Sequence, residues 1–385
     1  MSNKLSLKII YILMIIYSIC DILNSASAGN ATDNRGRVYI FLFAVIAVLL
    51  LCCLNSRYLP KMTILSSMIL FVIYYIVDTA IIKGDTSWNF IVYTGLSVWW
   101  ILTVWFFFNI ISKDINILVS VQNFIRIMFA LFSLGIAYGA INITNNYSVS
   151  YARVGFVYHL LAMIPFILLD RNNKVKNVFL IIAIALTVFS FKRGAIIILP
   201  CMLLAYFFFD RNVEKNNILK IIIIIILIIL VWHAIDCYSG GYLSSRFTRD
   251  ELMDGSGRSD IWQTALNNIS MRNLFQVIFG IRNAGEQVLW TGIHNEWISL
   301  LNINGVIGLI LFGCIVFAII IQAFRLVRKK SILSGSYMAL VVYIVGVCWV
   351  SGFFHVHSTF YVMAFLGTTQ GLLLYDDERI LEVLE

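Results

Sequence analysis

Charged residues are scarce in this chain: only 12% of its 385 residues are Asp, Glu, Lys or Arg, and 61% are hydrophobic. Proline is also rare, with three residues, so few positions interrupt a helix. A soluble domain needs a charged surface, and a chain with a mean hydropathy of +0.89 cannot supply one. The composition therefore excludes a soluble globular protein and indicates an all-α polytopic membrane protein.

The seven cysteines lie scattered along the chain and form no Cys-x-x-Cys pair. This pattern favours small buried side chains over a disulfide framework or a zinc site. His355 and His357 form the only closely spaced histidine pair, but residues two apart on a helix point in nearly opposite directions. We therefore expect no metal and no other cofactor.

Apolar runs of roughly 18 to 25 residues, the length that crosses a bilayer as a helix, recur along the chain. They predict about twelve transmembrane helices in a single membrane domain of residues 1–385. The expected spans lie near residues 7–23, 38–55, 62–82, 88–111, 117–141, 154–169, 174–190, 194–209, 217–236, 296–322, 332–350 and 353–374.

Lys and Arg concentrate in alternate loops, near residues 57–61, 171–176, 211–220 and 325–330. By the positive-inside rule, both chain ends are expected in the cytoplasm, and residues 237–293 form a large outer loop. The net charge of +8 follows from this bias and implies no nucleic-acid partner.

Residues 1–28 resemble a signal peptide, with two lysines, an apolar core and a final Ser-Ala-Ser-Ala. No soluble exported domain follows them, so we expect an uncleaved first span.

Four ionisable residues from separate segments are expected at the outer face. Arg153 precedes the sixth span, Arg193 lies in a short turn before the eighth, Arg258 starts a predicted amphipathic helix, and His294 precedes the tenth span. Guanidinium groups match phosphate oxygens bidentately, and a histidine can take a proton near neutral pH. We predict that the three arginines bind a diphosphate and that His294 is a catalytic base. Snorkelling of long side chains at the interface is the alternative for Arg153 and Arg193, and a solvated side chain is the alternative for Arg258.

Asn295 and Glu296 follow His294 and are placed to hold loop backbone or sugar hydroxyls, although helix capping explains them nearly as well. His355, expected at the same face, is a further candidate for sugar contacts. The span behind His294 holds three glycines that permit close helix packing, Gly305, Gly308 and Gly313.

Three stretches together resemble the superfamily of bacterial O-antigen polymerases and O-antigen ligases. They are "SFKRGAIIILP" (190–200), "GSGRSDIWQTALNNI" (255–269) and "HNEWISLLNINGVIGLILF" (294–312). The expected topology extends the resemblance over nearly the whole chain. It implies a GT-C-like helical glycosyltransferase in the cytoplasmic membrane, with its active site on the outer side and no need of a metal or nucleotide sugar.

The family's arginines and histidine would map onto Arg193, Arg258 and His294, and Arg153 is a weaker match. The implied substrate is an undecaprenyl-diphosphate-linked oligosaccharide, and the implied partners are a chain-length regulator and a flippase of the same pathway.

A polymerase joins repeat units, whereas a ligase transfers the glycan to lipid A-core. We favour the polymerase, for O-antigen or capsule. A polysaccharide-lipid transporter or flippase is the alternative from another class. Transporters usually carry charges near the membrane midplane, whereas here only Arg126 is expected deep within a span.

Overall fold

A computed structural model describes residues 3–26, 35–54, 62–85, 87–141, 155–170, 172–210, 226, 229–237, 240–245, 247–248, 258–281, 293–353 and 358–384. These ranges are helical and contain no strand, which confirms the all-α prediction. Two of the predicted site residues, Arg153 and His355, lie outside the described residues.

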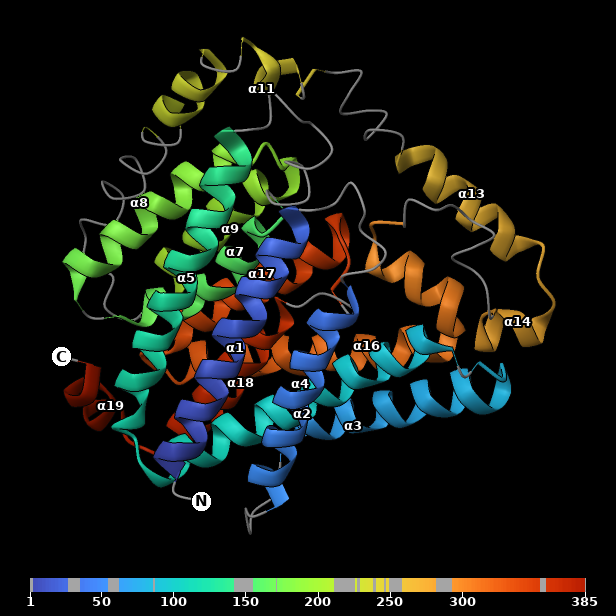
Figure 1. Ribbon diagram of the computed structural model, residues 1–385, viewed down its shortest axis with the longest axis horizontal. Helices are drawn as coiled ribbons and strands as arrows, with labels where there is room; N and C mark the ends of the chain where they lie inside the picture. The colour runs from blue at the N-terminus through green and yellow to red at the C-terminus, as the bar shows by residue number, and fades with distance from the viewer. Residues whose placement is uncertain are drawn as a thin grey trace.

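The helices, in chain order, are α1 (Asn3–Ala26), α2 (Arg35–Leu54), α3 (Thr63–Ile76), the π-helix η2 (Val77–Ile82), α4 (Trp88–Lys113), α5 (Ile117–Ile141), α7 (Val157–Leu169), α8 (Asn173–Phe189), α9 (Arg193–Phe209), α11 (Tyr242–Ser245), α13 (Arg258–Ser270), α14 (Leu274–Phe279), α16 (Glu296–Arg328), α17 (Ser334–Val350), α18 (Thr359–Leu372) and α19 (Asp377–Leu384). Figure 1 shows α13 and α14 together at one edge of the molecule.

The helices reproduce the predicted hydrophobic spans closely. One or more of the helices named above overlaps each predicted span except the ninth (217–236), and most of that span falls outside the described residues. Five of the described helical segments are long and apolar enough to cross a membrane, and α2, α7, α9 and α17 contribute shorter apolar helices. The protein is thus helical, and several of its helices have the length and composition of membrane spans. The total of about twelve spans stays a prediction.

Small residues bring α18 and α4 into close contact. Gly367 and Gly371 are four residues apart on one face of α18, and a Cβ atom on either would collide with α4, at Val104 O and at Ile111 Cβ respectively. Trp100 of α4 donates a hydrogen bond from Nε1 to the Thr359 hydroxyl at 3.0 Å. Such small-residue faces are how helices associate where lipid supplies no hydrophobic driving force.

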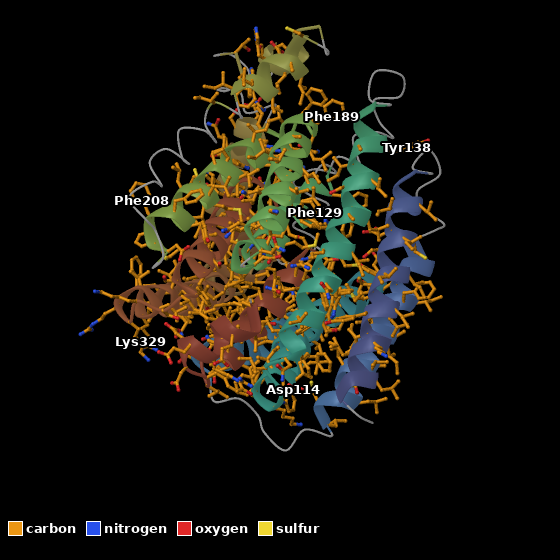
Figure 2. The ribbon with its side chains drawn as sticks, turned by 90° about the vertical axis from the view of Figure 1, so that its left-hand side faces the viewer. Asp114, Phe129, Tyr138, Phe189, Phe208 and Lys329 are labelled. Carbon is orange, nitrogen blue, oxygen red and sulfur yellow. The ribbon has the colours of Figure 1, made fainter. Side chains whose placement is uncertain are left out.

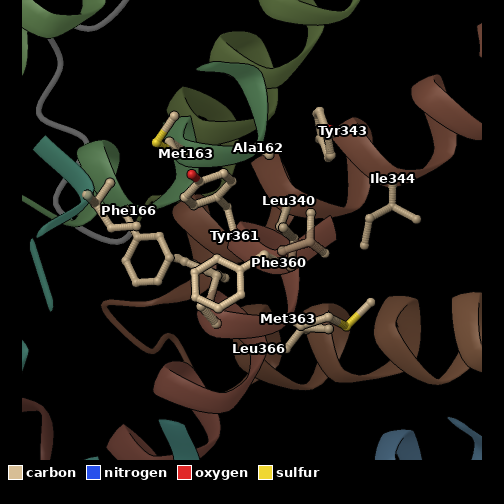
Figure 3. Close-up of a cluster of buried hydrophobic side chains, with 14 of the residues drawn as sticks. Ala162, Met163, Phe166, Leu340, Tyr343, Ile344, Phe360, Tyr361, Met363 and Leu366 are labelled. Atoms are coloured by element: carbon tan, nitrogen blue, oxygen red, sulfur yellow. The ribbon is translucent and has the colours of Figure 1, made fainter. Parts of the chain in front are cut away.

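The centre of the molecule is a cluster of fully buried side chains from α7, α17 and α18 (Figure 3). Tyr343 of α17 lies at its edge and donates from its hydroxyl to Tyr158 O at 2.9 Å. The same hydroxyl lies 3.2 Å from the Ser358 hydroxyl. This polar link joins the middle of α17 to the starts of α7 and α18.

Arg126, which is expected deep in a span, forms an ion pair with a residue of a neighbouring segment. α5 crosses the molecule from the Asp114 end to the Tyr138 end (Figure 2). Arg126 of α5 forms an ion pair with Asp170, the residue that follows α7, and donates to Asn123 Oδ1 at 3.0 Å. The pairing gives Arg126 a structural role between α5 and the α7–α8 turn.

Candidate functional site

Two of the predicted arginine positions meet at Val350, the last residue of α17. α9 begins at Arg193, and a Cβ atom on the next residue, Gly194, would lie 2.6 Å from Val350 Cγ2. Arg258, the first residue of α13, donates from Nη1 to Val350 O at 3.0 Å. The starts of α9 and α13 therefore lie on either side of the end of α17, although they are far apart in sequence.

The start of α16 is tied to the same segment, residues 349–353. Asn295 is the N-cap of α16: its side-chain oxygen accepts from Ile298 N at 3.1 Å, and its Nδ2 donates to Trp349 O at 3.3 Å. Glu296 accepts a hydrogen bond from Phe353 N. Both side chains are almost fully buried, at 3% and 4% exposure. The structure shows that both side chains form hydrogen bonds with backbone groups, which is one of the two interpretations given above. Their role in binding sugar stays a prediction.

His294 itself is exposed and has an unusual backbone conformation, with a φ of 47°. Left-handed backbone in a non-glycine residue costs about 1–3 kcal/mol and persists where the surroundings enforce it. Here the flanking residues do so, because Trp262 Nε1 donates to Ile293 O at 2.7 Å and Asn295 is fixed as described. The imidazole is thus presented to solvent from a backbone that is held on both sides.

The predicted amphipathic helix after Arg258 is present as α13. Its apolar stripe is turned partly towards the protein, since Ala265 is fully buried and Trp262 bonds to Ile293. Arg258 stands at the helix N-terminus, where the helix dipole disfavours a cation. The bond to Val350 O at the C-terminus of α17 offsets part of that conflict, and an anion bound beside Arg258 would offset more of it.

We define the His294 face as the region around residues 349–353, where α9, α13 and α16 begin and α17 ends. Two arginine-bearing helix starts and an exposed imidazole surround one backbone segment there. Arginine side chains are able to bind an anion, and an imidazole is able to accept a proton. In the described part of the chain, no group of three or more His, Cys, Asp or Glu side chains is placed to hold a metal ion.

A second feature of this region is a break in α16. Gly305 has a φ of 64° and a ψ of −166°, so it interrupts the helix nine residues after Glu296. Gly280, which ends α14 with a φ of 76°, lies directly against the break. A Cβ atom on Gly280 would collide with Ile303 O, and one on Gly305 would collide with Ile278 O. This close approach requires glycine at both positions.

Side chains from other elements bind the carbonyl groups that precede the break. These hydrogen bonds run from Arg272 Nη1 to Asn302 O (3.1 Å), from Lys83 Nζ to Ile303 O and from Tyr74 OH to Asn304 O (2.6 Å). A buried carbonyl without a partner is costly, most of all in a membrane. The three donors therefore stabilise the broken form of α16.

One of these donors belongs to a buried ion pair. Lys83 contacts Asp78 of η2, and their side chains are 6% and 0% exposed. Asn304 Nδ2 also donates to Asp78 Oδ2, at 3.0 Å. Burial lowers the pKa of Lys83 below its ordinary value, and the contact with Asp78 opposes that shift.

Sequence reasoning missed this cluster. The available signals were an acid and a base five residues apart at the end of the third span, and the "NING" stretch (302–305) inside an apolar run. The prediction of close packing for the three glycines of α16 covers only part of what they do. Gly305 forms the break, Gly308 packs against Tyr74, and a Cβ atom on Gly313 would have no neighbour within 4 Å among the described residues.

Replacing Lys83 by Met is expected to destabilise the protein by about 3 to 5 kcal/mol, because it leaves the Asp78 carboxylate buried without its cation. A lower melting temperature of the purified protein in detergent measures the effect. Adding Asp78→Asn should restore part of the loss, since no charge is then unpaired. Arg379→Met is the matched control: its partner Glu382 is exposed, and an exposed pair contributes less than about 1 kcal/mol. Equal shifts for Lys83→Met and Arg379→Met would contradict this account.

In comparisons with known proteins, no family model matches the chain and no curated protein matches it.

Proposed function

We propose that this protein is a surface-polysaccharide polymerase. It would join undecaprenyl-diphosphate-linked oligosaccharide repeat units at the outer face of the bacterial cytoplasmic membrane by metal-independent glycosyl transfer. The observation that supports this most is the meeting of Arg258, the Arg193–Gly194 helix start and the start of α16 around residues 349–353. The sequence resemblance to O-antigen polymerases and ligases supports the same reaction.

In the proposed reaction, Arg193 and Arg258 bind the diphosphate of the donor and neutralise its charge. His294 takes the proton from an acceptor hydroxyl, and that oxygen forms a new bond to the anomeric carbon of the donor glycan. The bond between the anomeric carbon and the phosphate oxygen breaks, and undecaprenyl diphosphate leaves with the bonding electrons. A diphosphate whose charge is neutralised is a good leaving group, so the scheme needs no covalent enzyme intermediate.

The proposal places residues 237–293 outside the cell membrane, with about twelve spans keeping the polyprenyl tail in the bilayer. Arg153 and His355 are proposed as additional contacts to diphosphate and sugar. A chain-length regulator and a flippase of the same pathway are the proposed partners.

The transporter alternative has less support. A broken helix is common in transporters, but the carbonyls before Gly305 are bonded to side chains of the protein. The deep Arg126 is likewise paired, with Asp170. The segments that carry Arg193, Arg258 and His294 instead gather around residues 349–353, and an enzyme acting at the membrane surface requires such a cluster of segments.

Deleting the gene tests the proposal and separates the related activities. Loss of an O-antigen polymerase should leave a single repeat unit on lipid A-core, because ligation continues. Loss of a capsule polymerase should remove capsule and leave lipid A-core unchanged. Bare core with accumulated lipid-linked polymer would identify the ligase instead. Normal glycans of every kind would reject the proposed function.

A further inference from the structure

The short helix α14 exposes large apolar side chains. Leu274 and Phe275 of its first turn are 76% and 58% exposed, and Met271, just before the helix, is 83% exposed. The charged neighbour Arg272 points the other way, because its Nη2 donates to Asn302 Oδ1 at 2.6 Å. The segment therefore turns its charge towards the protein and its apolar face away from it, the reverse of a surface that meets water.

The position of α14 indicates what covers this face. α14 ends at Gly280 against Ile303 O, the same carbonyl that Lys83 binds from the end of η2. Figure 1 shows α14 beside the end of the α3–η2 helix. α3 and η2 together form one of the helical segments long enough to cross a membrane, Thr63–Ile82. In a bilayer crossed by Thr63–Ile82, α14 would lie where that span ends.

The span beside α14 has an apolar stripe that no other part of the described structure covers. Its members recur every three or four residues. They are Leu70 (58% exposed), Ile73 (53%), Val77 (39%) and Ile81 (74%). This spacing marks one face of a helix, and on a membrane span such a face contacts lipid. The exposed side chains of α14 thus lie on an element next to the end of a span whose apolar stripe is also exposed.

The ends of α14 are also suited to a place with little water. Asn273 and Gln276 form a capping box, with Gln276 N donating to Asn273 Oδ1 at 2.9 Å and Asn273 N to Gln276 Oε1 at 3.3 Å. At the other end, Gly280 N donates to Gln276 O at 2.8 Å, and Ile281 N donates to Asn302 O at 3.1 Å. Backbone groups that would otherwise need water are thus bonded within the protein.

We propose that α14 is an interfacial helix that inserts Met271, Leu274 and Phe275 into the lipid of the membrane leaflet on the His294 face. Helices of this kind bury their apolar side about 5–10 Å into the boundary between headgroups and acyl chains. Through Arg272 and Gly280, the lipid-anchored segment is joined to the break in α16. This inference does not depend on the proposed reaction, because it concerns only how the segment meets lipid.

Depth-dependent quenching tests the insertion. A dansyl amino acid is incorporated at position 274 of the full-length protein, and in a matched control at Asn267, an exposed polar position on α13. Both proteins are reconstituted into phosphatidylglycerol–phosphatidylethanolamine vesicles. At position 274 we expect blue-shifted emission. Lipids that carry a shallow nitroxide should quench this emission, and aqueous iodide should not. At 267 we expect the opposite pattern.

Water-like emission and iodide quenching at both positions would overturn the proposal. Blue-shifted emission at 274 without lipid quenching would also overturn it, because a second copy of the chain or another protein would then cover α14. The unmodified protein provides a second measurement that does not depend on either variant folding. Vesicles that contain a diazirine-bearing lipid should, on illumination, label Met271, Leu274 or Phe275 in preference to residues of α13.

Discussion

Replacing His294 by Asn is expected to abolish polymer formation while the protein stays folded. If the imidazole is the base that deprotonates the acceptor, its loss should lower turnover about a hundred- to ten-thousand-fold. Asn is the informative substitution because it tolerates left-handed backbone better than most residues, and His294 has a φ of 47°. Turnover of lipid-linked repeat units by the purified protein is the measurement.

His294→Ala and His294→Gly complete the test. Alanine should lose the same activity and also some stability, because it is strained at this φ, whereas glycine relieves the strain and still lacks a base. Melting temperatures separate the two effects. Near-normal turnover of the Asn and Gly variants would show that His294 is not the catalytic base.

Replacing Arg258 by Gln is expected to weaken the use of the donor without unfolding the site. Glutamine keeps a polar side chain near Val350 O, to which Arg258 Nη1 donates at 3.0 Å, but it carries no positive charge for the diphosphate. Loss of a charge-assisted hydrogen bond costs about 1.5–3 kcal/mol, or roughly ten- to a hundredfold in kcat/KM. Kinetics with varied concentrations of the lipid-linked donor give this value.

Arg258→Lys should recover only part of the loss, because it restores the charge but not the planar fork. Arg328→Gln, at the exposed end of α16, is the matched control and should leave kcat/KM unchanged. If Arg258→Gln behaves like Arg328→Gln, Arg258 is a structural link to α17 and another residue binds the donor.

Hydrophobicity along the sequence is sufficient to place most of the helices. A bilayer span needs a run of apolar residues of a certain length, and this is a local property that each segment carries by itself. α5 is expected over 117–141 and is observed at Ile117–Ile141, and α16 begins with Glu296 as expected. Helix starts are likewise local, because the capping Asn295 lies next to the helix that it caps.

Parts of the candidate site are also visible in the sequence. Arg193, Arg258 and His294 stand out because polar groups at the edge of apolar runs are costly and need a reason. Their segments do meet in the structure, but the residues on which they meet, 349–353, give no signal of their own. Backbone carbonyls such as Val350 O are present in every residue, so a sequence cannot show which of them is bound.

Only the tertiary structure decides how the helices meet one another. The break at Gly305 depends on Gly280, Lys83 and Tyr74, which come from three other elements. In the sequence, glycine in a span is compatible with close packing or with a break, and the choice depends on whether donors lie beside the freed carbonyls. Two of the three donors, Tyr74 and Lys83, reach α16 from more than two hundred positions earlier in the chain. Contacts between residues so distant in sequence leave no periodic pattern, so folding alone determines them.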